Sequence, residues 1–139
     1  AQLQRHDLNT RQIAMDLMDS ISAEDLKIMG AVLADLHTYR EKGLTVSVIA
    51  VPAEALARMS QTAVEAIIDY ARALQGSDVG VVFKQQAPRY WSVSLRSTKI
   101  DVSQVAAALG GGGHIPAAGY SATGSLDQIT RDLLQALPE

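Results

Sequence analysis

One stretch of the chain reads Gly110-Gly111-Gly112-Gly113-His114-Ile115-Pro116-Ala117-Ala118-Gly119. It contains five of the ten glycines and one of the three histidines of this 139-residue protein. An ordinary helix or strand needs no run of four glycines. Glycine adopts positive φ freely and, without a Cβ atom, lets a ligand approach the backbone closely. Successive N–H groups can form an anion-binding concavity, and a histidine adds a donor that can carry charge near neutral pH. We therefore predict a phosphate- or nucleotide-binding loop.

A group of basic residues lies immediately before this stretch. Residues 84–99 contain no acidic residue and carry four bases, Lys84, Arg89, Arg96 and Lys99. The chain as a whole has a net charge of −3, which argues against a protein that binds long nucleic acids by bulk electrostatics. One local positive patch on an acidic chain indicates a bounded anionic ligand. The alternative is a hairpin that is basic without a function.

The hydrophobic pattern around the glycine run predicts alternating strands and helices. Strands are predicted at residues 45–51, 79–84, 90–96 and 117–123, with residues 85–89 as a hairpin loop. Helices are predicted at 53–59, at 62–76 with a Thr62–Glu65 capping box, after Asp101 with Gln104, and after Ser125 with Gln128. The hairpin is antiparallel, whereas the helical crossovers permit parallel pairs. These elements predict the α/β class, with a mixed β-sheet and helices packed on it.

Two helices are predicted before the first strand. One covers residues 9–20, and the second begins at Ser22 and ends at Gly43, where Arg40 and Lys42 suit the last turn. Residues 1–43 would then form a helical connector to something N-terminal, and residues 44–139 the main domain. His6-Asp7 has no partner ligands nearby. His37 lies one helical turn before Glu41, which predicts a surface pair.

The composition excludes several classes of protein. There is no cysteine, so disulfides and thiolate metal sites are absent, as is typical of a cytoplasmic protein. No apolar run approaches the ~20 residues of a membrane span, so we expect no membrane partner. Aromatic residues are only 4% of the chain, and the core must therefore be aliphatic. Because the chain begins at Ala1 without an initiator methionine, we expect a piece of a longer protein.

The sequence also resembles a known family. Ser92-Val93-Ser94-Leu95-Arg96-Ser97, then the Gly110–His114 run, and then Ala117-Ala118-Gly119 resemble the DHH-associated C-terminal domain of DHH-family phosphoesterases. The nearest subgroup is the oligoribonuclease and 3′-phosphoadenosine-5′-phosphate phosphatase type. It is related to cyclic-dinucleotide phosphodiesterases and RecJ-type exonucleases. The resemblance extends from the helices at 9–43 to the C-terminus and is most specific in the glycine-histidine motif.

The resemblance implies a division of labour between two domains. In the family, an N-terminal DHH domain holds two divalent metal ions, usually manganese, and the associated domain grips the substrate across a cleft. On this chain, the resemblance implies that Gly111, Gly112, Gly113 and His114 contact substrate phosphate. It implies that Arg96 pairs with phosphate or stacks near the base, a role that suits its planar donor fork, with Ser97 as adjacent support.

The sequence departs from the family's catalytic half. It has no Asp-His-His motif, and its three histidines are isolated. We therefore expect no catalytic residue, no metal ligand and no cofactor in this chain, which should bind substrate but not hydrolyse it. The metal ions would belong to the N-terminal DHH domain, which is the implied partner.

Three functions remain open at this point. The first is the substrate-binding domain of a metal-dependent phosphoesterase or exonuclease that acts on nucleotides or short oligonucleotides. The second is a non-enzymatic RNA-binding module, because a related domain is appended to alanyl-tRNA synthetases. The third is an assembly domain whose glycines only permit tight packing. The N-terminal helices could also mediate a homodimer.

Overall fold

A computed structural model describes residues 21–139 of the chain. The predicted helix at 9–20 and the His6-Asp7 dipeptide lie outside the described residues. The five helices of residues 21–139 are α2 (Ala23–Ala34), α3 (Ala53–Arg58), α4 (Gln61–Ala73), α5 (Val102–Ala108) and α6 (Leu126–Ala136). The six strands of the same part of the chain are β1 (His37–Glu41), β2 (Leu44–Val51), β3 (Val79–Ala87), β4 (Tyr90–Arg96), β5 (Gly112–Gly113) and β6 (Ala117–Thr123).

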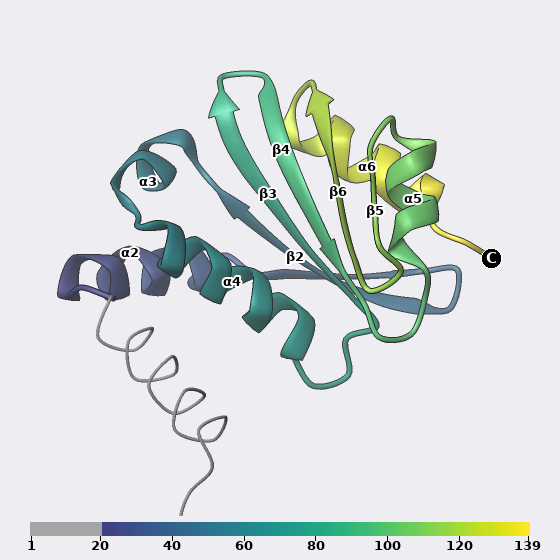
Figure 1. Ribbon diagram of the computed structural model, residues 1–139, viewed down its shortest axis with the longest axis horizontal. Coiled ribbons are helices and arrows are strands. Elements are labelled where there is room, and N and C mark those ends of the chain that lie inside the picture. The colour runs from purple at the N-terminus through teal and green to yellow at the C-terminus, as the bar shows by residue number, and fades with distance from the viewer. Residues whose placement is uncertain (1–20) are drawn as a thin grey trace, which may run out of the picture.

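All six strands form one sheet in the order β1-β2-β3-β4-β6-β5. Strands β2 and β3 are parallel, because helices α3 and α4 connect them, and the other neighbouring pairs are antiparallel. Figure 1 shows α2, α3 and α4 on one side of this sheet and α5 and α6 on the other. The predicted α/β class with a mixed sheet and packed helices is therefore confirmed.

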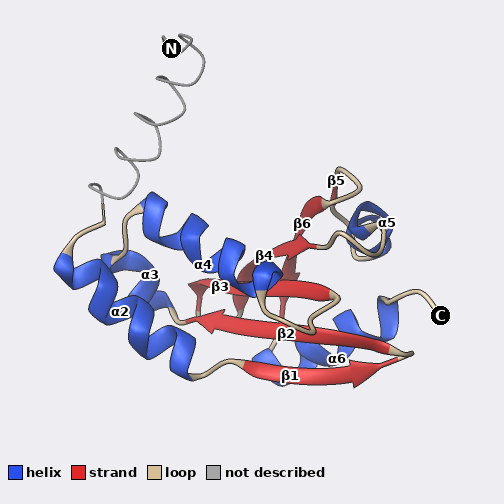
Figure 2. Ribbon diagram, turned by 90° about the horizontal axis from the view of Figure 1, so that it is seen from below, coloured by secondary structure: helices blue, strands red, loops and turns tan. Residues whose placement is uncertain are grey.

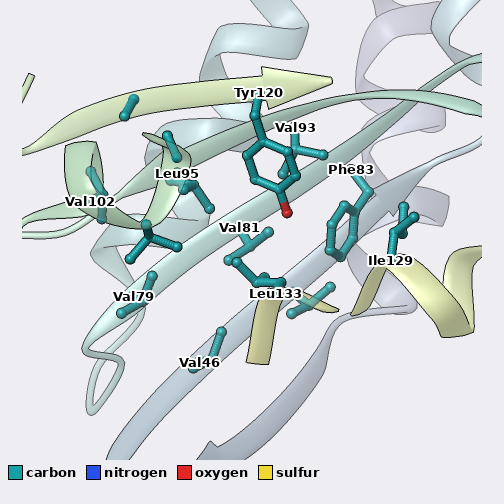
Figure 3. Close-up of a cluster of buried hydrophobic side chains, with 14 of the residues drawn as sticks. Val46, Val79, Val81, Phe83, Val93, Leu95, Val102, Tyr120, Ile129 and Leu133 are labelled. Atoms are coloured by element: carbon teal, nitrogen blue, oxygen red, sulfur yellow. The ribbon is translucent and has the colours of Figure 1, made fainter. Parts of the chain in front are cut away.

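Each face of the sheet has its own hydrophobic cluster, because successive side chains of a strand point to opposite faces. On what we call the α6 face, Val81, Phe83 and Leu95 pack with Leu133 of α6, as Figure 3 shows. Tyr120 also lies in this cluster, and burial raises the pKa of its hydroxyl. On the opposite side, which we call the α4 face, the buried residues of β2 and β3 pack against α2 and α4.

The prediction of a helix that continues to Gly43 is wrong. Helix α2 ends at Ala34, and residues 37–41 form the edge strand β1, paired with β2. Lys42 and Gly43 have φ of 52° and 78°, and two successive residues with positive φ form the two-residue turn that hairpins favour. The predicted His37–Glu41 pair does not form, and His37 Nε2 lies 3.5 Å from Asp35 Oδ1 instead.

Other predicted boundaries need smaller corrections. Ser60, not Thr62, caps α4, and its hydroxyl accepts a hydrogen bond from Ala63 N–H at 3.1 Å. Asp101 accepts from Ser103 N–H at 2.9 Å rather than pairing with Gln104. Strand β3 continues to Ala87, so the hairpin turn is shorter than predicted. The bounds of β4 and β6 and the Ser125 cap of α6 are confirmed.

Candidate anion-binding site

The glycine run begins as the end of helix α5. Gly110 has φ of 90° and donates a hydrogen bond to Ala107 O at 3.1 Å, while Gly111 donates to Ala106 O at 2.8 Å. This pair of bonds is the Schellman motif, in which glycine tolerates the left-handed residue after the helix. The first glycine of the run is therefore required by the helix end alone.

The run then turns back on itself as a short hairpin with β6. Gly112 pairs with Gly119, and Gly113 pairs with Ala118. His114 and Ala117 exchange two backbone hydrogen bonds of 2.9 and 3.2 Å, so the turn consists of Ile115 and Pro116. Figure 2 shows β5 beside β6 at the end of the sheet. His114 and the glycines thus lie on the outermost strand of the sheet and its turn.

Two of these glycines are enforced by packing. A Cβ atom on Gly111 would lie 2.2 Å from Gly119 O, and one on Gly113 would lie 2.5 Å from Ala118 Cα. Gly113 also has φ of 150°. Gly112 is different, because a Cβ atom there would meet no described heavy atom within 4 Å, and its φ is not positive. Within the described residues, nothing in the fold requires glycine at position 112.

The sheet register brings Arg96 to this hairpin. Arg96 pairs with Ala117, which in turn pairs with His114, so the three residues form one row across β4, β6 and the turn. The adjacent row of Leu95, Ala118 and Gly113 faces the α6 core. By the alternation of strands, Arg96 and His114 therefore share the α4 face. Strand pairing thus brings together two residues that are separated by 17 others in the sequence.

The side chains of Arg96 and Ser97 have different surroundings. One terminal nitrogen of Arg96 donates to Leu95 O at 2.9 Å, and the guanidinium makes no ion pair within the described residues. Ser97 is only 2% exposed. Its hydroxyl donates to Asp78 O and accepts from two backbone N–H groups, at 2.7 to 3.1 Å. Its own N–H donates to Pro116 O at 3.1 Å, so Ser97 fixes the end of β4 to the hairpin turn.

Small residues form the surface between β4 and β5. On the α4 face of β4 and β6 lie Ser92, Ala117, Gly119 and Ser121, which we call the platform. Ser94, 9% exposed, lies between the platform and β3. The members of the platform are half-buried or exposed. Within residues 21–139, helix α4 extends as far as β4, but no helix of the α4 face packs on β5 or β6. The result is a shallow polar surface next to the glycine run.

Sequence reasoning did not assign Lys84 to the site. Lys84 pairs with Ser92 across β3 and β4 and therefore lies on the α4 face, beside the platform. Its side chain is half-buried, and burial lowers its pKa. The positive charge of Arg96 lowers the pKa further, whereas Glu65 on α4 raises it. The basic residues at 84–99 were the sequence signal that could have indicated Lys84. Only the strand pairing shows that Lys84 lies beside the platform, whereas Lys99 forms an ion pair with Asp78 at 3.0 Å.

Other features of the described residues lie away from this surface. A hollow of about 480 Å³ between α2 and α3 is lined by residues such as Lys27, Asp35 and Arg58 and shares none with the glycine hairpin. In residues 21–139, no three His, Asp or Glu side chains gather in a way that could hold a metal ion. The side chains of residues 21–139 therefore do not supply the ligand set of a two-metal centre. No helix in this part of the chain is long and apolar enough to cross a membrane.

The chain matches a known family of domains. Residues 42–139 match the DHHA1 domain family. The chain belongs to that family, the domain associated with DHH phosphoesterases, and the resemblance seen in the sequence is confirmed.

Two solved structures show the same fold. A crystal structure of an exopolyphosphatase-related protein from Bacteroides fragilis matches with a TM-score of 0.72 at 20% identity, over 85% of this chain. The pGpG-specific phosphodiesterase PggH from Vibrio cholerae matches with a TM-score of 0.56 at 9% identity, over 89% of this chain. The present chain covers only 35% and 41% of those two chains.

Proposed function

We propose that this domain binds the phosphate of a nucleotide or short oligonucleotide for a metal-dependent DHH phosphoesterase. One observation carries the proposal. Gly112 is the glycine of the run for which the fold supplies no reason, and it opens onto the same face as His114 and Arg96. Close approach of a ligand to the backbone accounts for a glycine at such a position.

The local chemistry suits an anion. Arg96 offers a planar donor fork that matches phosphate oxygens, and His114 offers a ring N–H. Since His114 and Ala117 form a hydrogen-bonded pair, the next pair in an antiparallel ladder is a non-hydrogen-bonded one. The N–H group of Gly113 therefore points away from β6, towards the outer side of β5. Three kinds of donor would surround a phosphate there.

The same reasoning assigns a role to the wider enzyme. The metal ions, usually manganese in this family, would lie in an N-terminal DHH domain that performs hydrolysis. This chain would bind and position the substrate, and accurate positioning can account for several kcal/mol of a reaction barrier. The two related structures are named for polyphosphate and pGpG chemistry, which favours a phosphate-containing substrate here. Oligoribonucleotides, nucleoside bisphosphates and cyclic dinucleotides all remain within this proposal.

The direct test is a titration of the ¹⁵N-labelled chain with 5′-phosphorylated diadenylate, pApA. We expect amide shifts at Gly111–His114 and near Arg96, and a dependence of log Kd on log salt that corresponds to about one or two phosphates. An RNA-binding module would instead prefer long RNA and give a steeper dependence. An absence of shifts at the glycine hairpin would show that the site is placed wrongly.

A further inference from the structure

Lys84 has an environment that calls for an anion. Lys84 is half-buried, yet its ammonium group makes no ion pair or hydrogen bond within residues 21–139. Burial is the main cause of its lowered pKa, and the nearby charge of Arg96 acts in the same direction. Glu65 favours the charged form more strongly than Arg96 opposes it, but it makes no direct ion pair with Lys84, and its carboxylate accepts a hydrogen bond from Gln61 at 3.1 Å. Burying a charge is costly unless a partner compensates it.

The position of Lys84 separates it from the glycine hairpin. Three strand spacings lie between β3 and β5, which is ~14 Å at ~4.8 Å per spacing. Lys84 is also two residues further along the sheet than the row of Ser94, Gly119 and Gly112, which adds ~7 Å. A lysine side chain cannot bridge that diagonal. Lys84 therefore cannot contact a phosphate that is seated at Gly112.

The platform fills the space between these two positions. Its residues are small, so a flat sugar or base can lie on them without displacing side chains. Arg96 stands at the same end of the platform as His114, and Lys84 stands beside Ser92 at the other end. The α4 face of β4 and β6 is thus a neutral floor with cationic groups at both ends.

We propose that Lys84 contacts a second phosphate of the ligand, one that is separated by at least one nucleoside from the phosphate at the glycine hairpin. This inference rests on the proposed phosphate site at the glycine hairpin and extends it across the platform. A ligand with a single phosphate would use the hairpin end alone. The second phosphate would give Lys84 the direct ion pair that it does not make within residues 21–139.

The test compares two ligands on three proteins. Binding of pApA, which has two phosphates, and of AMP, which has one, is measured by calorimetry for the wild type, Lys84→Met and Arg131→Gln. Arg131 is an exposed base on α6, and it serves as a charge-matched control on the other face. We expect Lys84→Met to weaken pApA binding by about tenfold or more, with AMP binding unchanged and Arg131→Gln without effect. Lys84→Arg should restore most of the pApA affinity.

The possible failures are distinguishable. If the wild type binds neither ligand at the Gly111–His114 amides, the proposed function and this inference both fail. If pApA binds there but Lys84→Met weakens both ligands equally, or neither, only the second-phosphate role is overturned. Thermal unfolding followed by circular dichroism establishes that each variant is folded before its affinity is interpreted.

Discussion

The α4 face of the sheet has two halves that differ in what covers them. Over β2 and β3, the strands present Ile49, Val51 and Val82 to α4, all at most 1% exposed. Helix α4 lies so close that a Cβ atom on Gly80 would be 2.6 Å from the backbone of Ala71. Over β4, β6 and β5, the same face carries Tyr90, Arg96 and the small residues of the platform. Within residues 21–139, helix α4 extends as far as β4, but no helix of this face packs on β6 or β5.

This difference separates residues that stabilise the fold from residues available for binding. The covered half gains stability from apolar burial, whereas the open half has little apolar surface to lose to water. The bases of the open half lie at its ends rather than on its floor. An open surface that was merely solvated would need neither a glycine without steric cause nor a half-buried lysine that makes no ion pair within residues 21–139. Both features therefore support the proposed binding site in the open half.

The largest effect is expected in the covered half. Ile67 of α4 is fully buried, so Ile67→Ala should lower the free energy of unfolding by about 2–5 kcal/mol. Ser121→Ala on the exposed part of the platform should change it by less than about 0.5 kcal/mol. Urea unfolding of both variants measures the contrast. Equal losses would mean that the two halves do not differ in their contribution to stability.

The next effect is expected in the open half and concerns binding. Arg96→Ala should weaken pApA binding by about 1.5–3 kcal/mol, the range for a hydrogen bond to a charged group, and Arg96→Lys should recover only part because the bidentate fork is lost. Isothermal titration gives both values. Full affinity in Arg96→Ala, with an unchanged unfolding midpoint, would remove Arg96 from the site.

The sequence predicts the strands of the sheet unequally. Strand β4 is predictable to the residue, because Trp91, Val93 and Leu95 alternate with polar residues. Strand β1 is not, because His37–Glu41 lacks alternation and the Lys-Gly pair after it resembles a helix end as much as a hairpin turn. Pairing with β2 makes residues 37–41 a strand and Lys42-Gly43 a hairpin turn. This is a tertiary effect that local propensity cannot anticipate.

The candidate site shows the same limit. The glycine-histidine motif and Arg96 are visible in the sequence as a cluster and a basic window, and the register places them in one row. The different reasons for Gly111, Gly112 and Gly113 depend on what lies opposite each one on β6. The position of Lys84 beside the platform depends on the pairing of β3 with β4. The sequence therefore predicted which residues belong to the candidate site, but not which residues lie opposite them on the neighbouring strands.

A comparison of two adjacent glycines sharpens the distinction within the open half. Gly111→Ala should lower the free energy of unfolding by about 1–3 kcal/mol, because its Cβ would collide with the backbone of β6. Gly112→Ala should change stability by less than about 0.5 kcal/mol, yet weaken pApA binding by about tenfold, or about 1.4 kcal/mol. Thermal melts and titrations of both variants supply the four numbers. If the Gly112→Ala variant binds pApA normally, the glycine run serves packing and not ligand binding.

The smallest effect is expected on stability at acidic pH, in the helices that cover β2 and β3. Asp25 of α2 is 4% exposed. It accepts hydrogen bonds from Ser22 N–H, Ser60 N–H and the Ser60 hydroxyl at 2.9 to 3.2 Å, which joins the beginnings of α2 and α4. These bonds, those from Ser60 first, hold the pKa of Asp25 below its ordinary value of 3.8. Its contribution to stability is therefore complete above that value and is lost as the pH falls through the folded-state pKa.

Urea unfolding of the wild type and Asp25→Asn at several pH values tests this contribution. The asparagine variant should be less stable near neutral pH, because an amide has one acceptor oxygen in place of two. The difference between the two proteins should shrink as the pH falls below about 4. Asp78, whose pKa is lowered by Thr45 N–H and Lys99, keeps its own acid dependence in both proteins and cancels in the difference. If the difference in the free energy of unfolding stays constant with pH, the charge of Asp25 does not hold α2 and α4 together. If the difference shrinks while the amide shifts of Gly112 stay unchanged, the effect of acid is confined to the covered half.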